Sequence, residues 1–430
     1  MVYDTVVVKC GTKGTDGPEN VDIETMLDLV VDARCLHVVR KVMIDVRYRT
    51  SPLQGLNAVI ERMRGAAGEW AGVRKLGLSL NASGTGQREL NLPAADHEDE
   101  IASVSSALAA LMPGLREIKL DALKETPIVR VLFGQLAGFY ADQLQVLHSS
   151  SSLVVPQDRV FARLRYVKIT GPYSGPLGAK LPRLDPAVVE SLVLKGPTVN
   201  NTWSMFCADS DGCAITFPRL TNLDLKYLSS DQVGPGQFSR ERPWALQFPA
   251  VKHVRISCED EECPSMENAV FPDCLESLDL TACSSMLPVF AGRNLRVSRK
   301  LALYVEYKHD ASNRDIDIAN RMFAESDSYN VGRLVVTGID PIPPELITCT
   351  GLAHLHFNGV TTADYVMQFI RRQRHLLRLQ IDAQILKYLL LRIPTLKSIY
   401  THVTSNEEIQ SFIDEYVQWY PHLANVEVVD

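Results

Sequence analysis

The chain has 430 residues, of which 46% are hydrophobic, and its 44 basic and 51 acidic residues give a formal net charge of −7. This length and apolar content are enough for a large core. A negative net charge without a block of Lys or Arg argues against nucleic acid and against a membrane surface as partners. The N-terminus has no basic stretch followed by an apolar run, and eighteen apolar residues never occur together, so we expect no signal peptide and no membrane span.

Nine cysteines are scattered from Cys10 to Cys349, without the closely spaced framework of a disulfide-rich domain. Such a pattern is typical of reduced thiols in an intracellular protein. We therefore predict a cytoplasmic or nuclear location.

One short phrase recurs along the chain. Its fullest copies are FPRLTNLDL from Phe217, FPAVKHVRI from Phe248 and FPDCLESLDL from Phe271. The looser pattern apolar-x-x-apolar-x-apolar returns about every 27 residues, a period within the leucine-rich-repeat range. It predicts short strands over residues 38–44, 73–78, 115–120, 144–149, 164–169, 189–194, 220–225, 251–256, 275–280, 298–303, 331–336, 352–357, 376–381, 396–401 and 423–428.

The alternation within each copy predicts how the strands pack. In LTNLDLK, Leu223 and Leu225 share one face of the strand, and the polar residues between them share the other. One strand cannot bury its apolar face alone, so successive copies should stack into a parallel sheet whose back is covered by the return segments. We predict that Phe217, Phe248 and Phe271 cap the interior just before the chain turns into the strand. The proline after each of them should end the preceding return segment, since proline lacks an N–H group.

The return segments differ in kind. Apolar residues at three- and four-residue spacing predict helices over 57–70, 97–112, 361–376 and 405–420, and Ser405 with Glu408 fits a capping box. Segments 171–186 and 231–244 are rich in Gly and Pro and predict loops. Because no low-complexity linker divides the chain, we predict one domain, 1–430, of about fifteen repeats. Residues 1–35 would cap its N-terminal end, and 405–430 would supply the C-terminal capping helix and last strand.

This pattern resembles the leucine-rich-repeat superfamily of ribonuclease-inhibitor-like architecture over essentially the whole chain. Asn81 and Cys283 match the family's ninth-position Asn or Cys, whose side chain satisfies turn backbone groups; other copies hold Leu123, Leu228, Ile339 or Gln384 there. The resemblance implies an irregular α/β solenoid, a horseshoe with a parallel sheet on its concave face and helices and loops on its convex face.

In its irregular repeat lengths and its FPxLxxLxL motif, the chain looks most like divergent fungal leucine-rich-repeat proteins joined to an F-box. Those proteins are the substrate receptors of cullin-type ubiquitin ligases. Residues 1–45 contain no recognisable F-box. We expect an interaction scaffold that binds a protein or peptide. Two alternatives remain: a ligase receptor that binds a Skp1-like adaptor through an F-box lost or located upstream of Met1, and an enzyme regulator such as a GTPase activator.

The residues between the inward apolar positions are the candidates for binding. Their predicted central column comprises Lys119, Lys168, Val193, Asp224, Arg255, Asp279, Ala302, Val335, His356, Gln380, Tyr400 and Glu427, flanked by Lys41, Lys75, Lys195 and Lys226. We expect His356 to lie beside Gln380 and then Tyr400, and Asp382 beside His402. Tyr, Arg and His are typical of binding hot spots. The predicted protein-binding residues are His354, His356, Asn358, Arg378, Gln380, Asp382, Tyr400, His402, Asp224, Lys226 and Arg255.

Other readings of these residues stay open. The same patch could be an ordinary solvated polar face. A His–Asp pair with a nearby Ser and Tyr could do acid–base work, and His354 with His356 could bind a metal. Cys258, Cys263, Cys274 and Cys283 lack the spacing of a structural zinc site, and segment 207–213 lacks the ligands of a calcium loop. Since no phosphate loop, nucleophile elbow or metalloprotease motif occurs, we predict a non-enzymatic protein without cofactor or metal.

Overall fold

The computed structural model is an α/β structure that describes most of the chain. Of the described residues, those up to Leu220 form one compact unit and those from Thr221 form a second. All structural statements below concern residues 5–12, 21–25, 38–48, 51–65, 70–82, 93–124, 126–151, 153–155, 159–170, 183–195, 206, 214–226, 245–257, 268–281, 289–290, 295–303, 333–337, 354–358, 378–380, 390–391, 398–400, 406–425 and 427–429.

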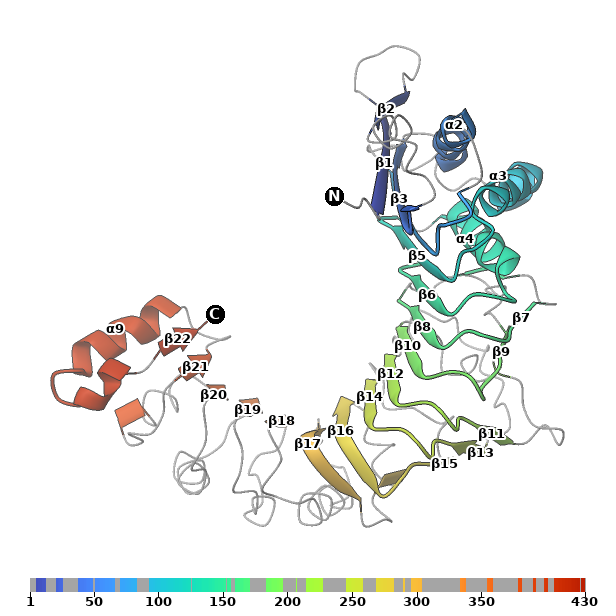
Figure 1. Cartoon of the computed structure of the whole chain (residues 1–430). Coiled ribbons are helices and arrows are strands. Elements are labelled where there is room, and N and C mark those ends of the chain that lie inside the picture. Colours follow the sequence, from blue (N-terminus) through green and yellow to red (C-terminus); the bar gives the residue numbers. More distant parts are fainter. Residues whose placement is uncertain are drawn as a thin grey trace. The chain divides into compact units, whose positions relative to one another are not determined.

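The first unit is built on one sheet (Figure 1), whose described strands follow the order β2-β1-β3-β4-β5-β6-β8-β10. From β3 to β10 the spatial order is the chain order, so each strand is added beside the last, as in a repeat protein. Only β2 runs antiparallel, to β1. The bounds are β1 Thr5–Thr12, β2 Val21–Thr25, β3 Lys41–Tyr48, β4 Lys75–Ala82, β5 Glu117–Ala122, β6 Val146–Ser149, β8 Tyr166–Ile169 and β10 Ser191–Lys195.

Strands β1 and β2 lie in the segment for which the sequence predicted only a cap. β1 pairs in parallel with β3, with Val6 opposite Val42 and Val8 opposite Ile44. Val6, Val8 and Cys10 are buried while Lys9 is exposed, so β1 has the alternation of the repeat strands. The repeat pattern is present in this segment as Tyr3, Val6 and Val8, although only a cap was predicted there.

The interior of this unit is a set of apolar ladders that run across the strands. In one of them, every side chain is at most 1% exposed. Each such burial stabilises the fold by about 1.5–3 kcal/mol, before the entropy of ordering the chain is subtracted. The members of this ladder are Val6, Val42, Leu76, Ile118, Leu147, Val167 and Leu192.

Helices lie along one side of this sheet (Figure 1): α2 Pro52–Gly65, α3 Glu98–Leu111 preceded by the 3-10 helix η3 Ala94–His97, and α4 Pro127–Phe139. α3 matches its prediction. α2 begins five residues before the predicted start, because Ser51 Oγ accepts a hydrogen bond from Leu53 N at 3.2 Å and Pro52 fits the first helical position.

The sequence patterns missed α4. No helix was predicted there, although its buried residues recur at the three- and four-residue spacing of a helix, at Ile128, Val129, Leu132, Phe133, Leu136 and Ala137. A capping signal was present nonetheless, since Thr126 Oγ1 accepts from Val129 N at 3.2 Å and Pro127 stands at the start of the helix.

A tight turn precedes many of the strands. Val251 N donates to Phe248 O at 3.4 Å, Leu115 N to Met112 O at 3.3 Å, and Val73 N to Trp70 O at 3.0 Å. Pro218 and Arg219 form the corresponding turn residues after Phe217. The recurring proline thus takes the second place of a turn, where its fixed φ fits and no N–H is needed, rather than simply ending the return segment.

The second unit contains the parallel strands β12 Asn222–Lys226, β14 His253–Ser257, β16 Cys274–Thr281 and β17 Arg296–Leu303. Behind them, Phe248 stacks on Phe271 with ring centroids 5.0 Å apart, and Phe271 lies 4.7 Å from Phe290. Phe217, in the first unit, is 0% exposed and packs against Phe206 at 4.8 Å. Phe217, Phe248 and Phe271 are thus buried just before their strands, as predicted.

Short strands in the return segments pair with one another in the same rising order. In the first unit β7 Val160–Phe161 pairs with β9 Arg183–Leu184, inside the segment predicted as a loop, and in the second β13 Ala245–Gln247 pairs with β15 Ala269–Val270. β11 Ala214–Thr216 is a further short strand. The predicted loop 231–244 and residues 171–182 lie outside the described residues.

The end of the chain forms a five-stranded parallel sheet of the order β18-β19-β20-β21-β22. The helix predicted over 405–420 is present as α9, whereas the one predicted over 361–376 and the Ser405 cap lie outside the described residues. The bounds are β18 Arg333–Thr337, β19 His354–Asn358, β20 Arg378–Gln380, β21 Ser398–Tyr400, α9 Asn406–Tyr416, the 3-10 helix η10 Pro421–Asn425 and β22 Glu427–Val429.

All fifteen strands predicted by the repeat pattern occur. Most begin two or three residues later than predicted, because the first apolar residue of the pattern, such as Leu115 or Val251, still belongs to the turn. None of the described helices is long and apolar enough to cross a bilayer.

Candidate functional site

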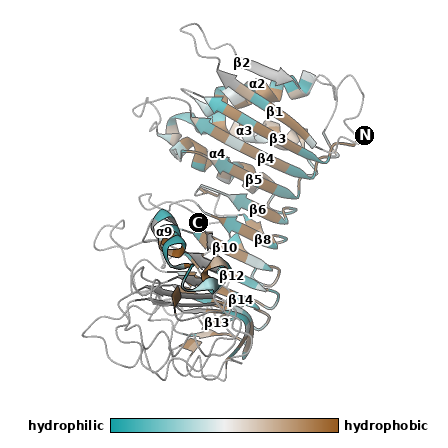
Figure 2. Cartoon of the chain, turned by 90° about the vertical axis from the view of Figure 1, so that its left-hand side faces the viewer, coloured by the Kyte–Doolittle hydropathy of each residue, from teal (hydrophilic) through white to brown (hydrophobic). Residues whose placement is uncertain are grey.

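The exposed face of the first unit's sheet is made by every second residue of each strand. Figure 2 shows the resulting alternation of hydrophilic and hydrophobic positions along the strands. Opposite the helices, Lys119 on β5 pairs in register with His148 on β6, and His148 with Lys168 on β8. We name these three residues the cationic track. The sequence pattern predicted Lys119 and Lys168 on this face and a strand between theirs, but it did not single out His148.

His148 lies half-buried at the centre of the cationic track. Burial lowers its pKa below the ordinary value, and the charge of Lys168, and to a smaller extent that of Lys119, lowers it further, while Glu117 and Asp121 act in the opposite direction. Burial and the two lysines therefore favour the neutral imidazole near neutral pH.

The carboxylates beside the track have local partners. Lys75 Nζ lies 2.8 Å from Glu117 Oε2, and Lys119 Nζ lies 2.8 Å from Asp121 Oδ2. Both pairs are at least one-third exposed, so each contributes little to stability.

Asn81 does not have the role that the family resemblance implied. It lies within β4, and its Nδ2 donates to Asp45 Oδ1 at 2.9 Å and to Ser79 Oγ at 3.0 Å. The amide thus joins two neighbouring strands on the sheet face instead of satisfying a turn, because β4 continues through Ala82. Cys283, the other match, lies outside the described residues.

Arginines line the edge of this sheet just before the strands. Arg74 Nη1 donates to Ala71 O and to Gly114 O, both at 3.0 Å, so its guanidinium joins its own turn to the next one. Arg40 Nη1 does the same with Gly72 O at 3.1 Å. Arg165 pairs with Glu190 across neighbouring strands. These arginines are engaged in holding the turns.

In the second unit, three predicted site residues lie on β12 and β14. Asp224 is opposite Arg255, which is opposite Asp279, and Lys226 is opposite Ser257. Arg255 Nε lies 3.9 Å from Asp279 Oδ2, and Lys300 Nζ reaches the same oxygen at 2.5 Å. The structure therefore places Asp224 and Arg255 in one row, as predicted.

A group of basic side chains around one carboxylate, which the sequence did not predict, lies next to this row. Glu276 on β16 is 3.3 Å from Lys252 Nζ, 3.3 Å from Arg299 Nη1 and 3.9 Å from His253 Nε2. The hydrogen bond from Lys252 and the nearby cations keep the pKa of Glu276 below its usual value. A register shift between Leu275 and Ser277 brings Arg299 beside Glu276, and such a bulge leaves no trace in the apolar pattern.

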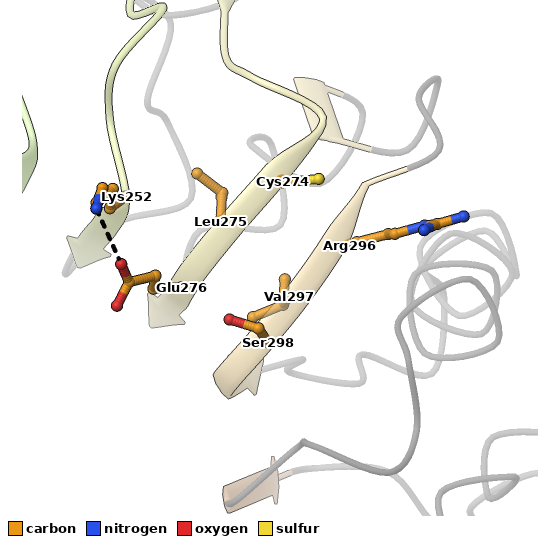
Figure 3. Close-up of a pocket in the computed structure, with 7 residues that line it drawn as sticks. All are labelled: Lys252, Cys274, Leu275, Glu276, Arg296, Val297 and Ser298. Carbon is orange, nitrogen blue, oxygen red and sulfur yellow. Dashed lines mark ion pairs between the residues drawn. The ribbon is translucent and has the colours of Figure 1, made fainter.

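A hollow of about 370 Å³ adjoins this cluster at the start of β16 and β17. Figure 3 shows that the Cys274 and Arg296 side chains point away from the Lys252–Glu276 pair. The thiol of Cys274 is free and exposed. The lining residues are Lys252, Cys274, Leu275, Glu276, Arg296, Val297 and Ser298.

The predicted C-terminal patch is in register along its backbone. His354 and His356 of β19 are opposite Arg378 and Gln380 of β20, and these are opposite Ser398 and Tyr400 of β21. Asn358 ends β19, opposite Thr337. The predicted contact between Asp382 and His402 lies outside the described residues.

One position of the predicted column was wrong. Tyr400 is opposite Val429, and Glu427 is opposite Ser398, two residues from its predicted place. The 3-10 helix η10 occupies the residues that the pattern assigned to the strand's start.

The alternative metal readings lie largely outside the described residues, which include Cys274 but not Cys258, Cys263 or segment 207–213. Within the ranges given above, no three His, Cys, Asp or Glu side chains gather at a metal-binding distance.

Comparison with known proteins adds no relative. No family model matches the sequence, and no curated protein matches it either.

Proposed function

We propose that this protein is a leucine-rich-repeat solenoid without catalytic activity, which binds a protein partner on the exposed faces of its parallel sheets. The proposal rests on one observation: rows of polar side chains stand in register across successive strands, on the side away from the buried ladders. Lys119, His148 and Lys168 form such a row in the first unit, and Asp224, Arg255 and Asp279 form one in the second.

Rigid spacing favours protein recognition. Neighbouring strands are about 4.8 Å apart, so the rows present side chains at fixed intervals and lose little conformational freedom on binding. Tyr166, which is 42% exposed beside Lys168, adds an aromatic contact of the kind enriched in interfaces.

Site-specific photocrosslinking in cells tests the proposal. A photoreactive amino acid is placed at Ser79 and at Val193, which stand on the exposed face of the sheet in the first unit. The matched controls carry it at Gln54 of α2 and Ser103 of α3, which are exposed on the helical side. Mass spectrometry then identifies the crosslinked proteins.

We expect the same partner to be crosslinked from Ser79 and Val193 and not from Gln54 or Ser103. Crosslinks that arise only from the helical positions would overturn the proposal. A Skp1-like adaptor among the crosslinked proteins would instead favour the ubiquitin-ligase receptor.

The C-terminal patch is tested separately by charge substitution. His356, Gln380 and Tyr400, which occupy one register row, are replaced together by glutamate. Weaker capture of the crosslinked partner, with an unchanged thermal unfolding curve, would place this patch in the interface, and unchanged capture would remove it.

A further inference from the structure

The exposed face of the first unit's sheet is basic although the whole chain is acidic. On strands β3 to β10 it carries six cations and three carboxylates, an excess of three positive charges, whereas the chain has a net charge of −7. The cations are Lys41, Arg47, Lys75, Lys119, Lys168 and Lys195, and the carboxylates are Asp45, Glu117 and Asp121.

The carboxylates of this face have local partners, whereas Lys168 has none among the described residues. Asp45 accepts from Asn81, Glu117 pairs with Lys75, and Asp121 pairs with Lys119. Among the residues that the structure describes, Lys168 makes no ion pair and is exposed. The surplus of positive charge therefore remains available to a partner.

We infer that the cationic track of Lys119, His148 and Lys168 binds an acidic, extended segment of the protein partner. This inference rests on the proposed function and names the chemistry that its interface recognises. Lys168 supplies an unpaired ammonium at one end of the track. Lys119 supplies the other, since its exposed pair with Asp121 is weak enough to be shared with an incoming carboxylate.

The dimensions of the track suit such a segment. Lys119 and Lys168 are separated by two strand spacings, about 10 Å. In a polyproline II segment, residues three apart lie on the same side at about 9 Å. A segment with an acidic residue at every third position could thus place one carboxylate on each lysine.

Protonation of His148 is linked to binding of the acidic segment. It is faced from β5 by Glu117, Lys119 and Asp121, and from β8 by Lys168 and Tyr166. In the free protein burial and then the two lysines disfavour the imidazolium, but a bound carboxylate favours it. Binding is therefore accompanied by proton uptake, and it tightens as the pH falls.

The face fits an acidic peptide better than a nucleic acid. A nucleic acid carries a charge on every phosphate, so its backbone would have to pass over Glu117 and Asp121, which flank the track. A peptide can place neutral residues at these points. The guanidinium groups of Arg74 and Arg165, which suit phosphate best, are already engaged with turn carbonyls and with Glu190.

Fluorescence anisotropy with the full chain tests the inference. The probe is a labelled peptide that repeats Glu-Pro-Pro, which favours polyproline II, and the matched probe repeats Gln-Pro-Pro. We expect binding of the Glu peptide only. We expect K119Q/K168Q to weaken it about tenfold at low salt, whereas R62Q/R64Q, which removes two cations from α2, should leave it within about twofold.

The proton linkage has its own variant. Affinity of the unaltered protein for the Glu peptide should rise from about pH 8 to about pH 6, and H148Q should lose most of this rise. An equal rise in H148Q would overturn the role of His148.

Two further outcomes would overturn the inference as a whole: no binding of the Glu peptide, or equal losses in K119Q/K168Q and R62Q/R64Q. Tighter binding of an oligothymidine, lost in K119Q/K168Q, would reassign the track to nucleic acid. If the Glu peptide fails to bind while Ser79 and Val193 still crosslink a partner, only this inference fails. If the peptide binds but the sheet face crosslinks no partner, the proposed function fails instead.

Discussion

Gly134 of α4 packs on the backbone of Val154 so closely that an added Cβ would lie 2.0 Å from the Val154 carbonyl oxygen. Backbone cannot move aside as a flexible side chain can, and Val154 N is itself held by Arg130 O at 3.2 Å. The contact fixes the distance between α4 and the segment that follows β6, so the absence of a side chain at residue 134 is a packing requirement.

Replacing Gly134 with Ala should therefore destabilise the protein by roughly 1–3 kcal/mol, the usual cost of overpacking. Urea denaturation measures this change in the free energy of unfolding. The matched control is Gly65→Ala at the end of α2, where a Cβ meets no atom within 4 Å. There, alanine should be neutral or stabilising by up to about 1 kcal/mol. Equal effects of the two substitutions would contradict the packing argument.

Tyr140→Phe should destabilise the protein by about 0.5–1.5 kcal/mol, because it removes a buried hydrogen bond to the Met112 carbonyl, which then keeps only Leu115 N as its donor. The Tyr140 hydroxyl is buried and donates to Met112 O at 3.1 Å, at the turn that follows α3. Tyr166→Phe, at an exposed position, serves as the control and should change stability by less than about 0.5 kcal/mol.

The same tyrosine predicts an alkaline limit of stability. Burial raises the pKa of Tyr140 above its ordinary value, so the unfolded chain releases the phenol proton first. The free energy of unfolding should fall as the pH rises above about 10, and less steeply in Tyr140→Phe. Identical slopes for the two proteins would show that this phenol does not contribute.

The phenylalanine stack of the second unit should be energetically coupled. Phe248 is 0% exposed and stacks on Phe271, so Phe248→Ala should cost about 3–5 kcal/mol. A double-mutant cycle with Phe248→Leu and Phe271→Leu measures the coupling, which we expect at about 0.5–1.5 kcal/mol. Additive effects would mean that each ring packs independently against the core.

His148 should make the first unit less stable in mild acid. Its pKa in the folded protein lies below the unfolded value, so the unfolded chain takes up the proton first as the pH falls. The free energy of unfolding should decrease below about pH 6.5, and His148→Gln should lack this contribution. In Lys168→Gln, an NMR titration should show the pKa of His148 nearer its ordinary value. No movement would exclude Lys168 as a cause.

Single strands show how much of the fold the sequence alone predicts. Leu223 and Leu225 are buried and Asn222 and Asp224 are not, as the alternation predicted, because a strand's two faces are set by its own residues. The same reasoning located all fifteen repeat strands, including the weak copy at 144–149 that became β6. It missed β1 and α4, although Tyr3, Val6 and Val8 follow the repeat pattern and the buried residues of α4 recur at helical spacing.

The tertiary structure decided which side chains lie beside one another. Asn81 reaches Asp45, 36 residues earlier in the chain, and Glu276 gathers Lys252 and Arg299 from two other strands. These contacts depend on register, on the bulge between β16 and β17, and on the turns that start each strand. The apolar periodicity of the sequence determined where the strands lie and which of their residues are buried, because burial acts on each strand separately. Which polar side chains share an exposed row depends on the register between neighbouring strands, and no single strand encodes that register.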